Sequence, residues 1–298
     1  MLYCVTDPYF VMIDLHLHST YSDGTCSPSE LVELAVAEGL SAVALTDHDT
    51  MDGVPEFSAA AQGRIRTIAG VELSADDDRG SVHILAYFLE ASAVFEPTLR
   101  AQRMDREARN LEILRRLEEY GLPLTYEEVR ACAAGGVVAR PHIADALVRR
   151  GLVGTAEEAF DRWIGNGKPA YVARRALTPE ACVRSVREAG GISVLAHPAT
   201  LNGALPEQRR RVRELAEAGL DGLEVFYPTH TRVHVRRYRA WARELGLAPA
   251  GGTDFHGDRR PGLRVGRGGG RFSVPSWCLD ELEQKLRSRR PRSSMDEK

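Results

Sequence analysis

The stretch of sequence that decides the fold is Ile13-Asp14-Leu15-His16-Leu17-His18-Ser19-Thr20-Tyr21-Ser22-Asp23-Gly24. Its first residues alternate as a strand requires, so Leu15 and Leu17 point to one face while His16 and His18 point to the other. Two imidazoles at this spacing, where a strand ends, can hold one metal ion. Taken alone, the pair fits an ordinary strand that ends in two histidines equally well.

The rest of the chain repeats this arrangement of a short apolar run next to histidine. Of the nine histidines, four more lie within or just after β-like runs: His48, His83, His197 and His256. Carboxylates accompany them, namely Asp23, Glu72 and Asp254. Nitrogen and oxygen ligands at the ends of separate strands are what a multinuclear metal site needs. We therefore predict that these side chains form one metal cluster.

Composition limits the function classes. With 298 residues, 43% hydrophobic and 27% charged, the chain is typical of a globular protein, and its net charge of −3 argues against long nucleic acid and favours a small anionic substrate. No run of residues is apolar and long enough for a membrane span. The five cysteines form no Cys-x-x-Cys pair, which indicates a reducing, cytoplasmic location. No feature indicates an obligatory protein partner.

Strand and helix patterns alternate along most of the chain. After the opening stretch, β-like runs occupy residues 41–46, 65–73, 82–88, 192–196, 222–226 and 247–252. We predict that seven parallel strands linked by crossover helices form a distorted (β/α)7 barrel, an α/β fold, over residues 12–96 and 170–288. An open doubly wound sheet is the alternative, but it would gather its ligands at one switch point rather than around a circle.

Residues 97–169 differ in character, because they contain helical patterns rich in arginine and glutamate and no β-like run. We predict an inserted helical cap subdomain over the strand ends, where loops of α/β barrels carry specificity. The glycine-rich segment from Gly266 to Ser273 is expected to be a surface loop. Residues 289–298 have the composition of a disordered tail.

Five ordered motifs carry a family resemblance across nearly the whole chain. They are His16-Leu17-His18 with Ser22-Asp23-Gly24, Leu45-Thr46-Asp47-His48-Asp49, Gly70-Val71-Glu72 with His83, Ala196-His197-Pro198, and Gly252-Thr253-Asp254-Phe255-His256. This series resembles the PHP (polymerase and histidinol phosphatase) family. With its helical insert, the chain is similar to the branch that contains 3′,5′-nucleoside bisphosphate phosphatases and short-RNA 5′ exonucleases.

The resemblance implies two or three divalent metal ions. His16, His18, Glu72 and Asp254 would hold one ion. Glu72 would bridge to a second ion held by His83 and His197, and Asp23, His48 and His256 would hold a third. Some members have histidine where this chain has Asp23, and the harder oxygen ligand makes manganese our first choice, with zinc and iron as alternatives.

The expected activity is hydrolysis of a phosphate monoester of a small nucleotide such as a 3′,5′-nucleoside bisphosphate. We expect a hydroxide that bridges the metal ions to attack phosphorus in line, with His230 as a candidate proton donor to the leaving group. Arg140, His142 and Lys168 lie in the insert and could bind a second phosphate. It is equally consistent with the sequence that His230 merely binds phosphate or lies on a loop. Arg140 and Lys168 could likewise lie on solvated helix faces, as most of the 39 Lys and Arg residues are expected to do.

Other functions remain open at this stage. Within the enzymes, the alternatives are a 5′-3′ exonuclease acting on short RNA and a histidinol phosphate phosphatase. A non-catalytic metal-dependent binding module is the alternative of another class. The complete ligand set favours an enzyme, and a substrate with two phosphates suits the basic residues of the insert better than histidinol phosphate does.

Overall fold

The computed structural model describes residues 11–89, 95–174, 177–269 and 272–289. Its centre is a sheet with the strand order β7-β6-β5-β4-β3-β2-β1-β8. The strands are β1 (Met12–Asp14), β2 (Ala42–Leu45), β3 (Arg66–Asp77), β4 (Gly80–Tyr87), β5 (Ile192–Leu195), β6 (Gly222–Phe226), β7 (Ala248–Gly251) and β8 (Val274–Pro275). Apolar runs such as β2 and β5 are buried along their whole length, because both faces of their sheet are covered.

The sheet curls until its first and seventh strands nearly close it into a barrel. Just after β1, the Leu15 N–H donates to the carbonyl of Gly251, the last residue of β7, at 3.2 Å, and the His18 N–H donates to the Phe255 carbonyl at 3.0 Å. Leu17 and Phe255 form a parallel bridge between the same segments. The predicted α/β barrel is therefore confirmed, and the alternative of an open doubly wound sheet is wrong.

The direction of one strand differs from the prediction. β4 runs antiparallel to both β3 and β5, whereas we expected seven parallel strands. Asp77 pairs with Gly80, so only two residues separate β3 from β4, and so short a connection can only join antiparallel strands. Gly80 has φ +112°, a conformation that residues with a Cβ avoid.

A further strand was missed by the sequence analysis. β8 pairs antiparallel with β1 and is only two residues long, so no alternating pattern can reveal it. The segment before β8 was expected to lie on the surface from Gly266 to Ser273. Gly266 is instead buried, and its N–H donates to the Asp14 carboxylate at 2.7 Å, while residues 270 and 271 lie outside the described ranges.

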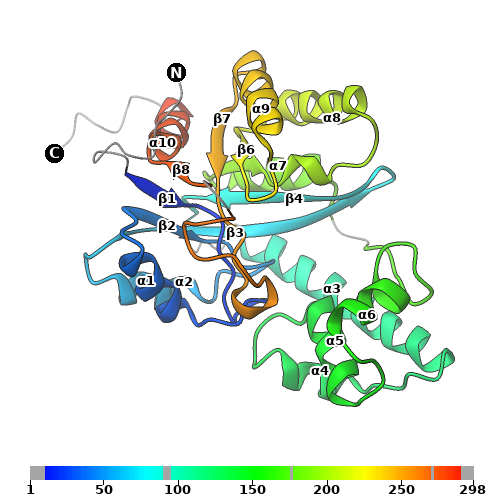
Figure 1. Ribbon diagram of the computed structural model, residues 1–298. Helices are drawn as coiled ribbons and strands as arrows, with labels where there is room; N and C mark the ends of the chain where they lie inside the picture. Colours follow the sequence, from blue (N-terminus) through cyan, green and yellow to red (C-terminus); the bar gives the residue numbers. More distant parts are fainter. Residues whose placement is uncertain (1–10, 90–94, 175–176, 270–271, 290–298) are drawn as a thin grey trace.

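Helices cover both sides of the sheet, as Figure 1 shows. α1 (Pro28–Ala37) and α2 (Val54–Ala61) pack near β2 and β3, α7 (Pro179–Glu188), α8 (Leu205–Glu217) and α9 (Arg232–Leu245) lie on the other side, and α10 (Trp277–Arg289) packs on β7. α1 begins at Pro28, because Ser27 and Glu30 form a reciprocal capping box. None of the helices in the described ranges has both the length and the apolar character that crossing a membrane requires.

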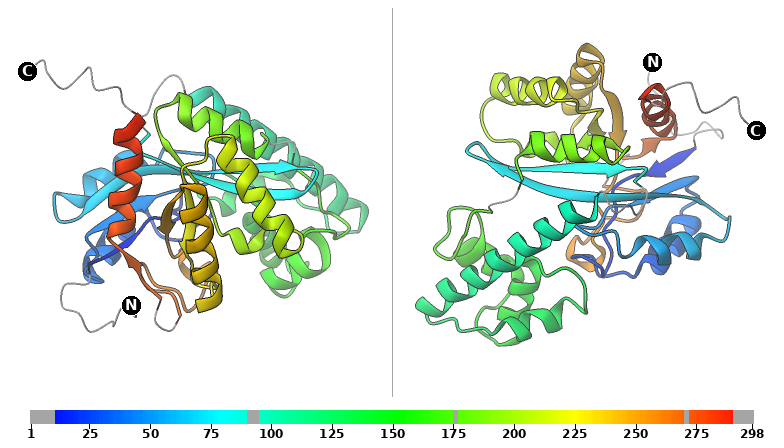
Figure 2. Two further views of the ribbon diagram at one scale, coloured as in Figure 1. Left: turned by 90° about the horizontal axis from the view of Figure 1, so that it is seen from above. Right: turned by 180° about the vertical axis from the view of Figure 1, so that it is seen from behind.

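The insert forms a helical cap beside the barrel, seen from two sides in Figure 2. Its elements are α3 (Glu96–Glu119), α4 (Tyr126–Cys132), α5 (Arg140–Arg149), α6 (Ala156–Ala159) and the π-helical turn η1 (Phe160–Ile164). They share an apolar core of their own, which includes Leu117, Val129, Ile143, Leu147 and Ile164. The boundaries 97 and 169 stay a prediction. Of the predicted tail 289–298, only Arg289, the last residue of α10, lies within the described residues.

Several contacts join the cap to the barrel close to the strand ends, and two of them involve residues near the predicted ligands. The Val137 N–H donates to the Tyr21 carbonyl at 2.9 Å, and Arg259 pairs with Asp145 of α5 at 2.6 Å. Tyr21 lies in the loop after β1, and Arg259 ends the short 3-10 helix η3 (Gly257–Arg259) that follows β7. The cap is therefore fixed next to the loops that carry the predicted metal ligands.

Candidate metal centre and substrate cleft

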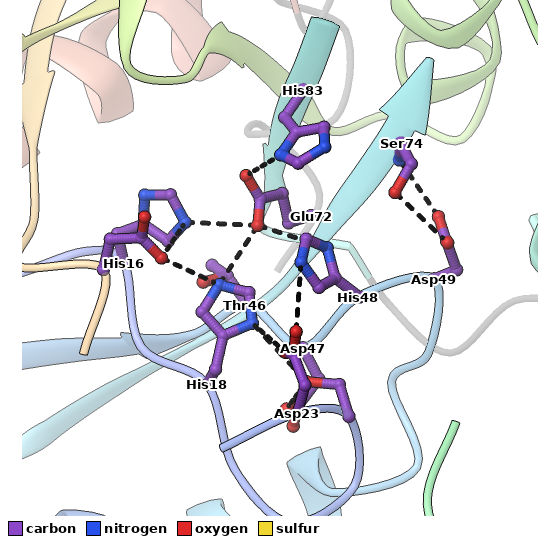
Figure 3. Close-up of polar contacts among 12 residues, drawn as sticks. His16, His18, Asp23, Thr46, Asp47, His48, Asp49, Glu72, Ser74 and His83 are labelled. Carbon is purple, nitrogen blue, oxygen red and sulfur yellow. Dashed lines mark hydrogen bonds and ion pairs between the residues drawn. The ribbon is translucent and has the colours of Figure 1, made fainter. Parts of the chain in front are cut away.

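The structure brings the predicted ligands together at the strand ends. Glu72 lies within β3 and His83 within β4, whereas the other ligands lie in the loops after β1, β2, β5 and β7. Figure 3 shows the side chains of His16, His18, His48, Glu72 and His83 pointing toward one another. Residues far apart in the sequence thus meet in a single cluster.

Glu72 stands at the centre of this cluster. Its Oε2 lies 3.3 Å from His16 Nε2 and 3.0 Å from His18 Nε2. Asp254 Oδ1 approaches the same two nitrogens at 3.4 and 3.3 Å. These four buried side chains can each direct one atom at a single ion.

The second oxygen of Glu72 faces two more imidazoles. Glu72 Oε1 lies 2.9 Å from His83 Nδ1 and 3.2 Å from His197 Nε2. His48 Nδ1 lies 3.3 Å from Glu72 Oε2, so His48, Glu72 and His83 also form a group able to hold an ion. Glu72 is therefore placed where one carboxylate can contact two ions.

A third group surrounds Asp23. Asp23 Oδ1 lies 3.4 Å from His256 Nε2, and Asp23 Oδ2 lies 3.9 Å from His48 Nε2. His18 Nδ1 is 3.7 Å from Asp23 Oδ1, so the geometry adds His18 to the set that the resemblance implies.

The donor atoms fit divalent metal ions. His16 Nε2, His18 Nε2, Asp23 Oδ1 and His48 Nδ1 are buried and have no hydrogen-bond partner among the described residues. Burying a polar atom without a partner costs about 1 to 3 kcal/mol, so four such atoms in one place indicate that something else satisfies them. A mixed set of imidazole and carboxylate ligands suits Mn²⁺, Zn²⁺ or Fe²⁺.

The electrostatics of the cluster also favour cations. Burial disfavours the charged form of Glu72, but the imidazoles of His83 and His16 outweigh burial and hold the pKa of Glu72 well below its usual range. For His18, burial is outweighed by Asp254 and Glu72, which raise its pKa to about 9. Because imidazole must be neutral to bind a metal, ions and protons compete here, and metal binding is expected to release protons.

Glu224 was missed by the sequence analysis, although it orients two ligands. Its Oε1 lies 3.0 Å from His16 Nδ1, and its Oε2 accepts a hydrogen bond from the His197 N–H at 2.6 Å. His197 has φ +25°, a strained backbone conformation that this hydrogen bond helps to hold. The signal available in the sequence was a glutamate within the apolar run that forms β6, and the structure shows that it is fully buried.

Asp254 is held by two further side chains that the sequence did not single out. The Tyr227 hydroxyl donates to Asp254 Oδ2 at 2.8 Å, and Arg260 Nη1 donates to the same oxygen at 2.5 Å. Asp254 Oδ1 is thereby left to face His16 and His18. Contacts of this kind fix a ligand's orientation and its basicity.

The acids on either side of His48 have structural partners instead. Asp47 accepts hydrogen bonds from the Ser19 N–H at 2.7 Å and from the Ser22 hydroxyl at 2.5 Å. Asp49 accepts from Arg106 Nη2 at 2.6 Å, which ties α3 of the cap to the loop after β2. Both acids therefore position the His48 loop, and neither belongs to the three ligand groups.

A cleft of about 960 Å³ opens above the cluster. On the barrel side it is lined by ligands such as Glu72, His197 and His256, together with Arg260. On the cap side it is lined by Arg140, Pro141, Asp145, Ala156, Glu157, Phe160 and Asn166. The ligand cluster and the cap thus form two walls of one cleft.

Comparison with known proteins identifies the family to which this architecture belongs. The PHP domain model matches residues 14–137. A 5′-3′ exoribonuclease of Haemophilus influenzae is 36% identical over 245 residues, which are 82% of this chain and 89% of the relative. The chain belongs to the PHP family. A 3′,5′-nucleoside bisphosphate phosphatase of Chromobacterium violaceum is 32% identical over 257 residues, which are 85% of this PHP protein and 90% of that one.

Solved structures agree with this assignment. A protein of Bifidobacterium adolescentis, assigned as a metal-dependent phosphoesterase, has a TM-score of 0.82 and 29% identity, covering 94% of this chain and 98% of the other. An amidohydrolase of Chromobacterium violaceum, solved with bound sulfate and no metal, has a TM-score of 0.80 and 32% identity, covering 92% and 97%. The PHP protein is a metal-dependent phosphoesterase, hence a hydrolase of phosphoric esters, and the alternative of a non-catalytic binding module finds no support among these relatives.

The three residues predicted to bind substrate occupy different environments. Arg140 lines the cleft. His142 is buried, and its Nδ1 accepts a hydrogen bond from the Ala139 N–H at 3.0 Å, so it caps the start of α5. Lys168 is exposed and is not among the residues that line the cleft. Of the three, only Arg140 lines the cleft.

His230 lies behind the cleft rather than in its wall. The Tyr227 ring stands 5.6 Å from the His197 ring and 5.3 Å from the His230 ring. His230 Nδ1 lies 2.9 Å from the Val225 carbonyl, and its Nε2 is buried without a hydrogen-bond partner among the described residues. The role of His230 as proton donor stays a prediction, and this geometry gives it no support.

Proposed function

We propose that this PHP protein removes a phosphate group from a small nucleotide that carries two phosphates, such as a 3′,5′-nucleoside bisphosphate. The observation that carries the proposal is an arginine without an acidic partner in the cleft wall. A phosphate at the metal ligands and a second phosphate at Arg140 would use both walls. The C. violaceum relative named as a 3′,5′-nucleoside bisphosphate phosphatase supports this substrate class.

The surroundings of Arg140 support an anionic ligand. Its Nη1 reaches only the Ile164 carbonyl and the Asn166 side-chain oxygen, both at 3.4 Å, and no carboxylate of the described residues pairs with it. Arg106, deeper in the cap, is by contrast paired with Asp49. Burial lowers the pKa of Arg140, yet a guanidinium stays protonated in proteins, so a phosphate would find a partly desolvated positive charge.

The metal ions, when bound, would neutralise the phosphate oxygens and supply an activated water. The chain's own residues set the geometry of this step. Glu224 orients the His16 ring and holds the His197 backbone, and Tyr227 and Arg260 hold Asp254. Arg260 lines the cleft and has further N–H groups that can donate to a phosphate oxygen. Asp23 makes manganese our first choice of metal.

Hydrolysis of short RNA from its 5′ end is the second candidate function. The H. influenzae relative named as a 5′-3′ exoribonuclease favours it. The Arg259–Asp145 pair, which lines the cleft and spans from barrel to cap, would limit passage of a long strand. Histidinol phosphate has one phosphate and would leave Arg140 unused.

Phosphate release by the purified, Mn²⁺-loaded protein tests the proposal. The substrates are adenosine 3′,5′-bisphosphate, 5′-AMP, histidinol phosphate and a 5′-phosphorylated trinucleotide. We expect the highest kcat/KM with the bisphosphate. Preference for the trinucleotide would establish the exonuclease function instead, and equal rates with bisphosphate and histidinol phosphate would refute the role of Arg140.

A further inference from the structure

Phe160 gives the cap wall of the cleft an apolar, planar surface. Among the described residues that line the cleft, it is the one aromatic side chain of the cap, and it is only half-buried. Ala156 also lines the cleft, and it lies four residues earlier, a spacing that places both side chains on the same helix face. A short apolar strip therefore interrupts a lining that is mostly charged and polar.

The backbone at Phe160 is unusual in a way that separates two aromatic residues. Phe160 begins the π-helical turn η1, and its carbonyl accepts from the Gly165 N–H at 2.9 Å. π-helical turns are rare and occur frequently at functional sites. Trp163 of the same turn packs 5.7 Å from the Tyr120 ring and joins the cap core. Phe160 also packs against the cap core, but of the Phe160 and Trp163 rings only that of Phe160 lines the cleft as well.

Polar groups adjoin the Phe160 ring. The Arg140 guanidinium lies 5.9 Å from the ring centre. The Asn166 side-chain oxygen lies 3.4 Å from Arg140 Nη1, and Asn166 lines the same cleft as Phe160. An amide offers a donor and an acceptor to the edge of a planar ligand, whereas the guanidinium binds an anion. A phosphate of the ligand would meet the guanidinium, the face of a planar ligand ring would meet Phe160, and the edge of that ring would meet the amide.

We propose that Phe160 is the platform on which the nucleobase of the substrate stacks, with the Asn166 amide at the edge of the base. This inference rests on the proposed nucleotide substrate and extends it, because the phosphates alone do not require an aromatic residue. Every base has a π-face, so stacking on Phe160 tolerates all bases. Any preference among bases therefore comes from Asn166.

The test compares Phe160→Leu with Phe160→Trp on two substrates that differ only in the base. One substrate is adenosine 3′,5′-bisphosphate and the other is the base-free 1-deoxyribose 3,5-bisphosphate, both with the Mn²⁺-loaded protein. Leucine keeps the apolar volume without the ring, so Phe160→Leu should raise KM for the adenosine compound about 5- to 100-fold, as loss of one base stack does. KM for the base-free compound should stay unchanged, and Phe160→Trp should keep the wild-type KM for both.

Two results would overturn the inference, and they are distinguishable. An equal effect of Phe160→Leu on both substrates, or no effect on either, would show that the ring does not bind the base, while the proposed function would stand. A wild-type protein that hydrolyses neither bisphosphate would refute the proposed function itself. Thermal unfolding of each variant separates loss of binding from loss of the cap fold.

Discussion

The two walls of the cleft satisfy their charged groups in different ways. In the barrel wall, Glu72 is within 3.3 Å of five imidazoles, and buried donor atoms still lack hydrogen-bond partners. In the cap wall, Arg140 has only two weak contacts to oxygen, and Phe160 is half-exposed. Under the proposed function, the barrel wall would hold cations and the cap wall would meet an anionic, planar ligand. Chemistry and substrate selection would thus belong to different elements of the chain.

This division predicts the largest loss of activity in the barrel wall. Asp254→Ala or His197→Ala should lower kcat/KM by roughly a thousandfold or more, because bound metal contributes several kcal/mol to such reactions. Phosphate release and bound metal, measured by elemental analysis, check this. His234→Ala is the control, since His234 caps α9 away from the cluster and should behave as wild type. Undiminished hydrolysis by both site variants would refute the proposed centre.

The free energy of unfolding should depend on pH through His142, because this residue has a structural role. Burial lowers its pKa to about 4, so the unfolded chain takes up a proton between pH 6.5 and 4 that the native protein does not. Stability should therefore fall as the pH drops through this window, by at most about 3 kcal/mol. Urea unfolding at pH 7, 5.5 and 4.5 measures it.

The matched variant for this experiment is His142→Gln. Glutamine at this position keeps the capping contact with Ala139 but does not titrate. The variant should lose less stability on acidification than the wild type does. Equal losses would show that His142 is not the group responsible.

Substrate selection should depend on Arg140 and not on Lys168. Arg140→Ala should lower kcat/KM for adenosine 3′,5′-bisphosphate about 10- to 100-fold, because hydrogen bonds to charged groups contribute about 1.5 to 3 kcal/mol. The effect on 5′-AMP should be smaller, since it has one phosphate. Lys168→Ala should stay within about twofold for both substrates, as exposed positions usually do. A larger loss for Lys168→Ala would mean that the exposed lysine, rather than Arg140, contacts the second phosphate.

The smallest effect should arise where the two walls touch. The Arg259–Asp145 pair is partly exposed, so a double-mutant cycle of Arg259→Ala and Asp145→Ala should give a coupling of about 0.5 to 1 kcal/mol in the free energy of unfolding. A coupling near zero would mean that the cap is held by its other contacts alone.

Strand direction shows where the sequence pattern was misleading. Apolar runs predicted all the longer strands. We also expected β4 to be parallel to its neighbours, as strands linked by helices are, but a two-residue turn joins it to β3. The turn residues themselves contained the correct signal. β8, two residues long, contained none.

The sequence by itself determined the barrel and the family, and it provided the proposed metal ligands. Local periodicity reveals the apolar runs and the histidines and acids at their ends. Because the ends of the strands of a barrel meet, these side chains could be expected to lie together. Only the tertiary structure decided which residues of the cap line the cleft. Arg140 reaches the cleft, whereas His142, two residues later on α5, is buried as a cap and Lys168 faces solvent. The same holds for Glu224, Tyr227 and Phe160, whose roles depend on how separate elements pack. Such positions depend on the docking of cap and barrel, which no local pattern encodes.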